Sequence, residues 1–255
     1  MIKNFFLLAF RNFYKHKLFV LINILGLGTA IGCCIVAYLN NKFEADFNIQ
    51  HKNLDKIYKV NIFRKINDRE QPYSYSPMSM APLMSSELIG AESVVRYLST
   101  GANLKYGNDA NSKIFEQNVA FADKDFFKMF TFKLKSGSLD QFNDKGKIIL
   151  TDEIANKYFG YENPIGKSLI IFDNKGIPVE LSVAAVIEKI PLNSMVIFDA
   201  VTIIDNYLSL YEVPEFDWKH FVGATFLMIP NKADVPKIET ALSKFIPMIN
   251  LFYFL

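Results

Sequence analysis

The chain has 255 residues, a formal net charge of +2 and 51% hydrophobic residues. Its length allows one large domain or two smaller ones, and the absence of a basic run with interleaved aromatic residues argues against nucleic-acid binding. A positive mean hydropathy of +0.14, together with 24 Phe and 12 Tyr residues, favours a membrane protein.

Patterns typical of catalysis or metal binding do not occur in the sequence. Neighbouring cysteines rarely bridge each other, so Cys33 and Cys34 cannot build a disulfide framework. The three histidines are scattered without metal-ligand spacing. A hydrolase elbow and a dinucleotide fingerprint are missing as well. We therefore expect neither an enzyme nor a bound cofactor.

Residues 1–17 are predicted to form a cytoplasmic, amphipathic stem. Apolar residues recur there at helical spacing, namely Phe6, Ala9, Phe10 and Phe13. A helix of this kind, with basic residues at its flank, is suited to lying in the inner headgroup plane of a membrane. A simple cytoplasmic extension of the following segment is the alternative.

Residues 18–40 are predicted to be a transmembrane helix. The stretch Leu18–Leu39 reads LFVLINILGLGTAIGCCIVAYL and carries no charge. As a helix it measures about 33 Å, which matches a hydrocarbon core of about 30 Å. A cleaved signal peptide has a shorter apolar region. A lipoprotein cleavage box, faintly matched by residues 30–33, is the weaker alternative.

Positive charges precede this helix. Arg11, Lys15 and Lys17 lie before it, whereas the acidic residues Glu44 and Asp46 come only after it. Basic residues concentrate on the cytoplasmic side of membrane helices. The three basic residues are therefore the expected orientation anchors, with the N-terminus in the cytoplasm and the remainder of the chain outside.

Small residues repeat every four positions within the predicted membrane helix. The pairs are Gly28 with Gly32 and Gly26 with Ala30. Small side chains let a second membrane helix approach closely, so we expect a nearly flat helix face that contacts partner helices. The general frequency of glycine in membrane helices is the alternative explanation.

After residue 41 the sequence changes to a mixture of strand and helix patterns. Strands are predicted at residues 57–63, 94–98, 114–121, 168–172, 179–187 and 224–229. Helices are predicted at residues 82–89, near 126–130 with Asp123 as N-cap, at 152–159 with Thr151 as N-cap and Gly160 as the stop, and from Asp234 onward. Because helices and strands are interspersed without regular alternation, the predicted class is α+β.

The stretch Gly160–Ser168 reads GYENPIGKS and ends like a phosphate-binding loop. Such a loop has four residues between its first glycine and Gly-Lys-Ser, whereas this stretch has five. Pro164 also removes an N–H donor, and a strand pattern follows where the motif needs a helix. Asn163, Pro164 and Gly166 are therefore predicted to form a structural turn.

Several stretches, taken in order, resemble the N-terminal half of MacB/FtsX-type permeases of ABC transporters. The matching stretches are residues 9–32, Phe47–Val60, Phe121–Gly137, Ile149–Leu169, Val183–Val201 and Ala224–Leu242. They cover nearly the whole chain. Each stretch is weak alone, and the ordered set carries the resemblance.

The resemblance implies a periplasmic core of two parts after the membrane helix. These are a membrane-proximal α/β part, residues 41–117 and 215–255, and an inserted β-rich part, residues 118–214. In such permeases a separate cytoplasmic ATPase subunit drives a permease homodimer, and motion passes through the membrane helices to the periplasmic domains. Related systems export peptides, antibiotics or lipoproteins, or transmit force within the envelope.

The resemblance thus implies a non-catalytic component of the bacterial inner membrane, with residues after about 40 in the periplasm. Its expected partners are the ATPase subunit, a second permease copy, membrane lipid and a further periplasmic or outer-membrane protein. Family members continue into three more membrane helices, whereas this sequence ends in Phe245–Leu255, a stretch too short to span. A gene fragment or a split subunit is therefore expected.

Two other functions remain as hypotheses. The first is a single-pass anchored binding or sensory module that engages envelope partners through its β-rich part. The second is an anchored hydrolase, which is less favoured because no nucleophile–base arrangement stands out in the sequence.

Overall fold

The structure, a computed structural model, describes residues 2–66, 69–107, 112–173 and 175–247. The chain divides into two units, Met1–Phe47 and Asn48–Leu255. The described part of the first unit contains the helices α1 (Ile2–Lys15) and α2 (Lys17–Ala45). Between them the backbone of His16 leaves the helical region, with φ −121° and ψ 49°. The predicted stem and membrane helix are therefore two separate helices.

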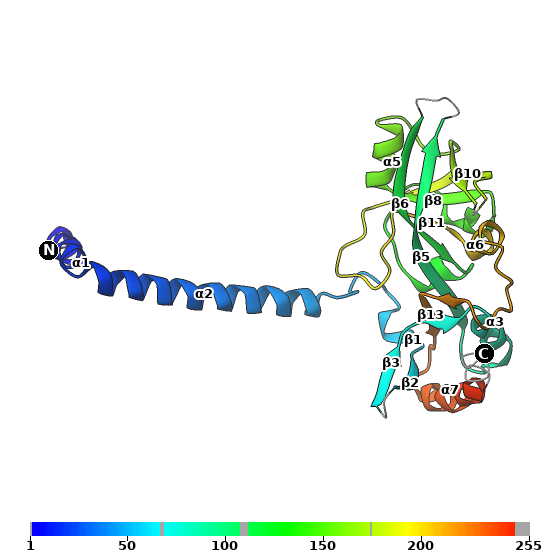
Figure 1. Cartoon of the computed structure of the whole chain (residues 1–255), viewed down its shortest axis with the longest axis horizontal. Coiled ribbons are helices and arrows are strands. Elements are labelled where there is room, and N and C mark those ends of the chain that lie inside the picture. Colours follow the sequence, from blue (N-terminus) through cyan, green and yellow to red (C-terminus); the bar gives the residue numbers. More distant parts are fainter. Residues whose placement is uncertain (1, 67–68, 108–111, 174, 248–255) are drawn as a thin grey trace. The chain divides into compact units, whose positions relative to one another are not determined.

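The second unit is built around a nine-stranded sheet, joined by two small two-stranded sheets within the described residues (Figure 1). The strands are β1 (Ile57–Lys59), β2 (Ile62–Ile66), β3 (Arg69–Tyr73), β4 (Ser76–Pro77), β5 (Ser93–Tyr106), β6 (Lys113–Ala122), β7 (Leu134–Gly137), β8 (Lys147–Thr151), β9 (Ser168–Phe172), β10 (Pro178–Ile187), β11 (Ala200–Ile203), β12 (Phe221–Val222) and β13 (Ala224–Met228). The α-helices are α3 (Met80–Glu87), α4 (Phe126–Met129), α5 (Asp152–Phe159), α6 (Ile204–Leu210) and α7 (Val235–Leu242). Short 3-10 helices are η1 (Leu54–Lys56), η2 (Leu139–Asn143), η3 (Lys232–Asp234) and η4 (Ser243–Phe245). This mixture confirms the predicted α+β class.

Part of the large sheet closes into a ring in the order β5, β6, β11, β8, β10, β9 and back to β5. The long strand β5 makes closure possible, because it pairs with β6 along one edge and with β13 and then β9 along the other. β10 likewise changes its partner along its length from β9 to β7. Closing a ring removes strand edges that would otherwise offer unpaired backbone groups.

Alternate residues of the ring strands meet in one core cluster, as the two-residue period of a strand dictates. The cluster contains Ala102, Leu104, Val119, Phe121, Ile148, Leu150, Leu169, Ile171, Leu181, Val183 and Ala200. α5 and α6 add side chains to the same cluster, among them Tyr158 and Ile204. The Tyr158 hydroxyl donates to the carbonyl oxygen of Leu104 at 2.9 Å, and burial raises the pKa of Tyr158 to about 12.

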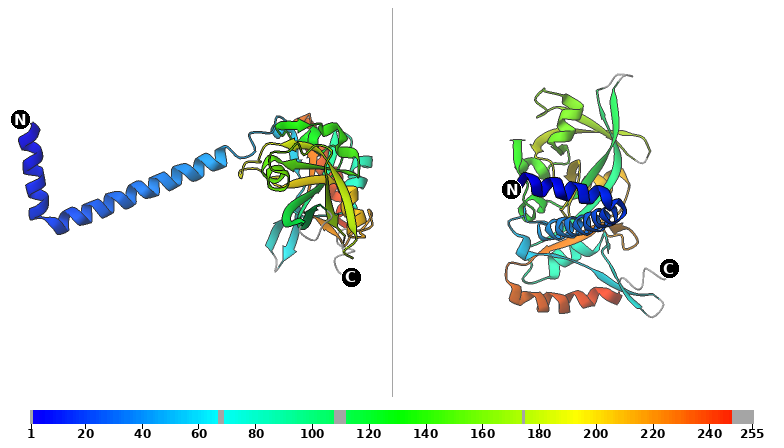
Figure 2. Two further views of the ribbon diagram at one scale, coloured as in Figure 1. Left: turned by 90° about the horizontal axis from the view of Figure 1, so that it is seen from above. Right: turned by 90° about the vertical axis from the view of Figure 1, so that its left-hand side faces the viewer.

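Two further clusters cover the rest of the sheet. The second contains the phenylalanines Phe126, Phe130, Phe142, Phe198 and Phe226. The third joins α3 and α7 to β13 through Met84, Ile238 and Leu227. Figure 1 and the right-hand view of Figure 2 show α5 beside the far end of β5 and β6, and α7 at the opposite end of this unit.

Most predicted elements are confirmed, and some details are wrong. The predicted strand 57–63 is two strands, because β1 pairs with β13 and β2 pairs with β3. Thr151 occupies the N-cap position of α5, but its side chain makes no capping hydrogen bond. Gly160 ends α5 as predicted, with φ +63°.

The predicted two-part division of the external region stays a prediction. Its boundary between residues 117 and 118 falls inside β6, which pairs continuously with β5 from Tyr106↔Lys113 to Tyr97↔Ala122. Residues 248–255 of the C-terminal stretch lie outside the described residues.

Candidate functional site: an apolar helix and the segment that follows it

α2 is the long apolar helix that the sequence predicted. It extends over 29 residues, and none of them is buried within the structure. A helix of this length measures about 44 Å, and α2 is long and apolar enough to cross a membrane. It is the one such helix among the described residues.

The predicted orientation anchors lie around the start of α2. Arg11 and Lys15 belong to α1, Lys17 is the first residue of α2, and all three side chains are exposed. The ammonium group of Lys17 lies 5.7 Å from the centre of the Tyr14 ring. This basic cluster can hold the helix end at the headgroup layer, because long basic side chains reach out of the apolar region into it.

The small residues of α2 lie in open space. A Cβ atom added to Gly26, Gly28 or Gly32 would meet nothing within 4 Å, and Ala30 is exposed. Two residues turn an α-helix by about 200°, so Gly26 and Ala30 lie on the face opposite Gly28 and Gly32. The expected single flat face is therefore two small patches, and their contact with partner helices stays a prediction.

The junction segment, residues 48–53, begins the second unit and is held by hydrogen bonds. Asn48 adopts a left-handed backbone, with φ 62°, which asparagine tolerates better than most residues. Its N–H donates to the carbonyl oxygen of Asn193 at 2.8 Å, and its Oδ1 accepts from the N–H of Met195 at 2.6 Å. These bonds attach the start of the segment to the loop between β10 and β11.

His51 attaches the same segment to a second loop. Its ring is buried, with Phe130 and Phe132 against it at centroid distances of 5.1 and 5.7 Å. His51 Nδ1 lies 3.1 Å from the Thr131 nitrogen and 3.2 Å from the Thr131 carbonyl oxygen, so it accepts from the first or donates to the second according to its tautomer. Burial lowers the pKa of His51, and its contact with the Thr131 backbone opposes that shift. The junction segment therefore contains a buried, tightly packed imidazole.

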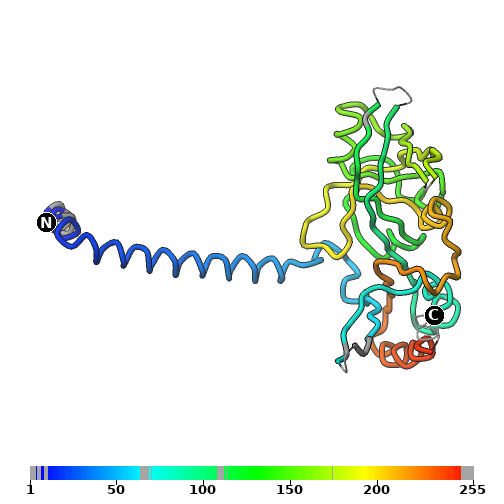
Figure 3. The backbone as a smooth tube through the Cα atoms, in the orientation of Figure 1, coloured from blue at the N-terminus to red at the C-terminus, as the bar shows by residue number. Residues whose placement is uncertain are grey.

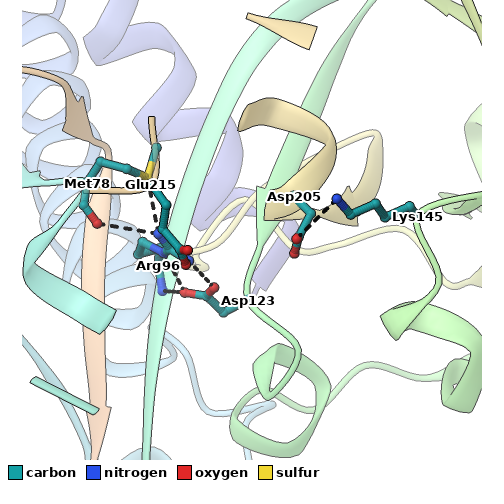
Figure 4. A network of polar contacts seen from close by, with 6 residues as sticks. All are labelled: Met78, Arg96, Asp123, Lys145, Asp205 and Glu215. Carbon is teal, nitrogen blue, oxygen red and sulfur yellow. Dashed lines mark hydrogen bonds and ion pairs between the residues drawn. The ribbon is translucent and has the colours of Figure 1, made fainter. Parts of the chain in front are cut away.

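A buried ion pair lies at the centre of the polar network in Figure 4. Arg96 of β5 donates through Nη2 to Asp123 Oδ1 at 2.7 Å and through Nε to Asp123 Oδ2 at 2.9 Å. Glu215 lies 3.6 Å from Nη2, and the Met78 carbonyl accepts from Nη1 at 3.4 Å. Burial acts to lower the pKa of Arg96, but the bonds and charge of Asp123 outweigh it and raise that pKa.

This pair corrects the predicted role of Asp123 as a helix cap. Asp125 occupies the N-cap position of α4, without a side-chain capping bond. Only the main-chain oxygen of Asp123 accepts from the N–H of Phe126, at 3.0 Å. The side chain of Asp123 turns to Arg96 instead, because a bidentate bond to a buried guanidinium is stronger than a bond to an exposed helix end.

The residues of GYENPIGKS form a turn between α5 and β9. Asn163 Oδ1 accepts from the N–H of Ile165 at 3.1 Å, and the Pro164 carbonyl accepts from the N–H of Lys167 at 3.0 Å. Gly166 has φ +81°, and its N–H donates to the Val183 carbonyl at 2.9 Å. This N–H is therefore already used within the fold.

Sequence reasoning missed the junction segment and the buried pair. Asp123 lies 27 residues from Arg96, and Thr131 lies 80 residues from His51. Neither separation leaves a local pattern, since the first contact depends on the pairing of β5 with β6 and the second on the packing of two segments outside the strands. The one available signal was the presence of a histidine and an asparagine directly after the apolar helix.

Known proteins resemble this chain in sequence pattern and in fold. The MacB-like periplasmic core domain family matches residues 20–245. A domain of a putative permease protein from Porphyromonas gingivalis has a TM-score of 0.60 at 19% identity, over 76% of this chain and 84% of that one. The periplasmic region of MacB from Actinobacillus actinomycetemcomitans has a TM-score of 0.54 at 19% identity, over 80% and 85%. No curated protein matches the chain.

The structural matches show a shared fold, while the family pattern extends from within α2 through the sheet to η4. That pattern covers most of the chain and agrees with the resemblance predicted from the sequence. The chain therefore belongs to the family of MacB-like periplasmic core domains.

Proposed function

We propose that the chain is the membrane-anchored, N-terminal part of a permease in an ABC-type export or mechanotransmission system. The supporting observation is the continuity of the family match, which begins inside α2 and runs through the external unit. In this proposal α2 spans the inner membrane, the N-terminus is cytoplasmic and residues after about 40 are periplasmic.

The proposed role is mechanical and non-catalytic. A separate cytoplasmic ATPase subunit supplies the energy, and two permease copies pass the motion outward. The junction segment supports this role because hydrogen bonds attach it to two different loops. An attached segment passes on a displacement that a flexible linker absorbs. Purification with a stable partner but without an ATPase subunit would favour the anchored sensory module instead.

The first prediction concerns orientation. Alkaline phosphatase fused after residue 60 is expected to be active, because the enzyme matures only outside the cytoplasm. Changing Arg11, Lys15 and Lys17 together to glutamate removes the positive-inside signal, so most phosphatase activity is expected to be lost. Green fluorescent protein at the same fusion point should give the opposite response.

The matched control reverses three charges on the other side of the helix, at Lys52, Lys56 and Lys59, which all lie within the fused portion of the chain. This control changes the net charge equally but is expected to leave the phosphatase active. Full activity in the stem variant, or equal loss in both variants, would contradict the proposed anchoring role.

The second prediction concerns contact between membrane helices. Gly28→Leu with Gly32→Leu is expected to weaken self-association, because leucine side chains prevent close approach of two helix backbones. Energy transfer between labelled copies in lipid bilayers measures the change. Gly26→Leu with Ala30→Leu makes the same kind of change on the opposite face. Equal association in all three proteins would remove the contact role from both patches.

A further inference from the structure

An exposed apolar surface lies beside the junction segment. Leu192 is 75% exposed and Ile49 is 64% exposed, and Pro191, directly before Leu192, is exposed as well. The hydrogen bond from Asn48 to Asn193 joins the two segments that carry these residues. Figure 3 shows the yellow loop between β10 and β11 beside the blue-to-cyan start of the second unit. Two segments distant in sequence therefore present apolar side chains from one region.

The β10–β11 loop (residues 188–199) holds Leu192 in a fixed place. The loop is anchored in the second core cluster on both sides of Leu192. Ile190 is buried there before it, and Val196 and Phe198 are buried there after it. Ser194 closes the loop internally, donating from its hydroxyl to the Val196 carbonyl at 3.1 Å. A single exposed leucine is ordinary, but an apolar patch that Leu192 forms together with Pro191 and Ile49 is typical of a surface that another phase or molecule covers.

Covalent connection keeps this surface near the end of α2. Only two residues separate Ala45, the last residue of α2, from Asn48, a reach of at most about 11 Å. Between Leu39 and Ala45 the helix rises by about 9 Å, while each headgroup layer is about 5–8 Å thick. If α2 crosses the membrane, the junction segment begins close to the headgroups, and helix tilt lowers it further.

The charges that flank the loop permit such an approach. Glu188 pairs with Lys133 at 3.4 Å, and Glu153 pairs with Lys189 at 2.6 Å. Both carboxylates are thus neutralised where anionic headgroups would repel them. Phe47, directly before the junction segment, is also 41% exposed.

We propose that Leu192 and Ile49 insert into the outer headgroup layer of the membrane that α2 crosses. A lipid surface fits better than a protein partner, because only two residues of chain separate the end of the proposed membrane helix from the segment that carries Ile49. The contact would fix the height and tilt of the external unit above the bilayer. This inference rests on the proposed membrane span, and the experiment separates the two.

The experiment places a tryptophan at chosen positions of the full-length chain in lipid nanodiscs. Trp218, the single native tryptophan, stays in every variant as a common background. Leu192→Trp is the test, and Ile177→Trp, at a 55% exposed position on the β9–β10 turn, is the control. Ile31→Trp on α2 reports the span. Nanodiscs with phosphatidylcholine brominated near the headgroup, which tests Leu192→Trp and Ile49→Trp, or deep in the acyl chains, which tests Ile31→Trp, are compared with unbrominated ones.

Quenching by brominated lipid is expected to be several-fold stronger for Leu192→Trp than for Ile177→Trp, with emission shifted to the blue. Ile49→Trp should behave like Leu192→Trp, which covers the case that one variant folds poorly.

Strong quenching at Ile31→Trp with none at Leu192→Trp and Ile49→Trp would overturn the surface contact alone. No quenching at Ile31→Trp would overturn the span as well. A blue shift at Leu192→Trp without quenching would indicate a protein partner and overturn the lipid contact.

Discussion

Replacing Asp123 with alanine is expected to lower the free energy of unfolding of the external unit by about 3–5 kcal/mol. The change leaves the Arg96 guanidinium buried, with its side chain 5% exposed and its strongest partner gone. Glu215 at 3.6 Å and the Met78 carbonyl at 3.4 Å are too long to replace two bonds of 2.7 and 2.9 Å. The backbone N–H of Arg96, which also donates to Asp123, loses its acceptor.

Urea unfolding of the full chain in detergent measures this loss, with Trp218 fluorescence as the probe, since Trp218 packs against the third core cluster. Lys175→Gln removes one partner of the exposed Lys175–Glu212 pair and serves as the control. It is expected to leave the unfolding midpoint unchanged, because exposed ion pairs contribute little.

A double variant tests whether the loss comes from an uncompensated charge. Arg96→Met with Asp123→Leu removes both charges and is expected to be more stable than Asp123→Ala alone. If the double variant is as unstable as the single one, packing rather than the buried charge determines the loss. A midpoint of Asp123→Ala equal to that of the unchanged chain would contradict the prediction outright.

Local patterns predicted those parts of the fold that depend on neighbours in sequence. The hairpin of β9 and β10 follows from two alternating runs around a turn, and its bounds differ from the predicted ones by one residue. α5 was predicted from its helical pattern and from Gly160, whose φ of +63° suits glycine. The apolar length of α2 fixed its helical state almost alone.

Parts of the fold that depend on distant pairing were not visible in the sequence. β5 was predicted to end at residue 98, and the following Ser-Thr-Gly-Ala-Asn includes residues with weak strand propensity. The strand continues to Tyr106 because β6 pairs with it there and β9 pairs with Leu104 and Lys105. Closure of the ring is therefore a tertiary effect that overrides local preference.

The residues of the candidate site show the same difference between local signals and distant contacts. Arg11, Lys15, Lys17 and the small residues of α2 could be named from the sequence, because charge asymmetry and glycine spacing in a membrane helix are local signals. The exposed apolar side chain of Leu192 could not be identified from the sequence in this way. One more leucine in a loop carries no signal until the structure shows that its neighbours are buried and it is not.

Replacing Gly137 with alanine is expected to destabilise the external unit by about 2–5 kcal/mol, the sum of strained backbone and overpacking. Gly137 ends β7 opposite Ala185 of β10 and has φ +80°, where a side chain is unfavourable. A Cβ atom there would overlap the Ala184 carbonyl oxygen and lie 2.8 Å from the Ala185 Cα. It would also lie 2.9 Å from the Ile165 side chain, which belongs to the predicted turn.

Gly176→Ala is the matched control, since Gly176 has a similar φ of +78° but open space where the Cβ would lie. Its expected loss is only the backbone strain of about 1–2 kcal/mol, so the difference between the variants isolates the close approach of β7 to β10. Urea unfolding measured as for Asp123→Ala gives both values. Equal losses would show that β7 moves away without resistance. A larger loss at Gly137 would mean that the clash with the β10 backbone is not relieved, because side-chain rotation cannot move a carbonyl oxygen held in the sheet.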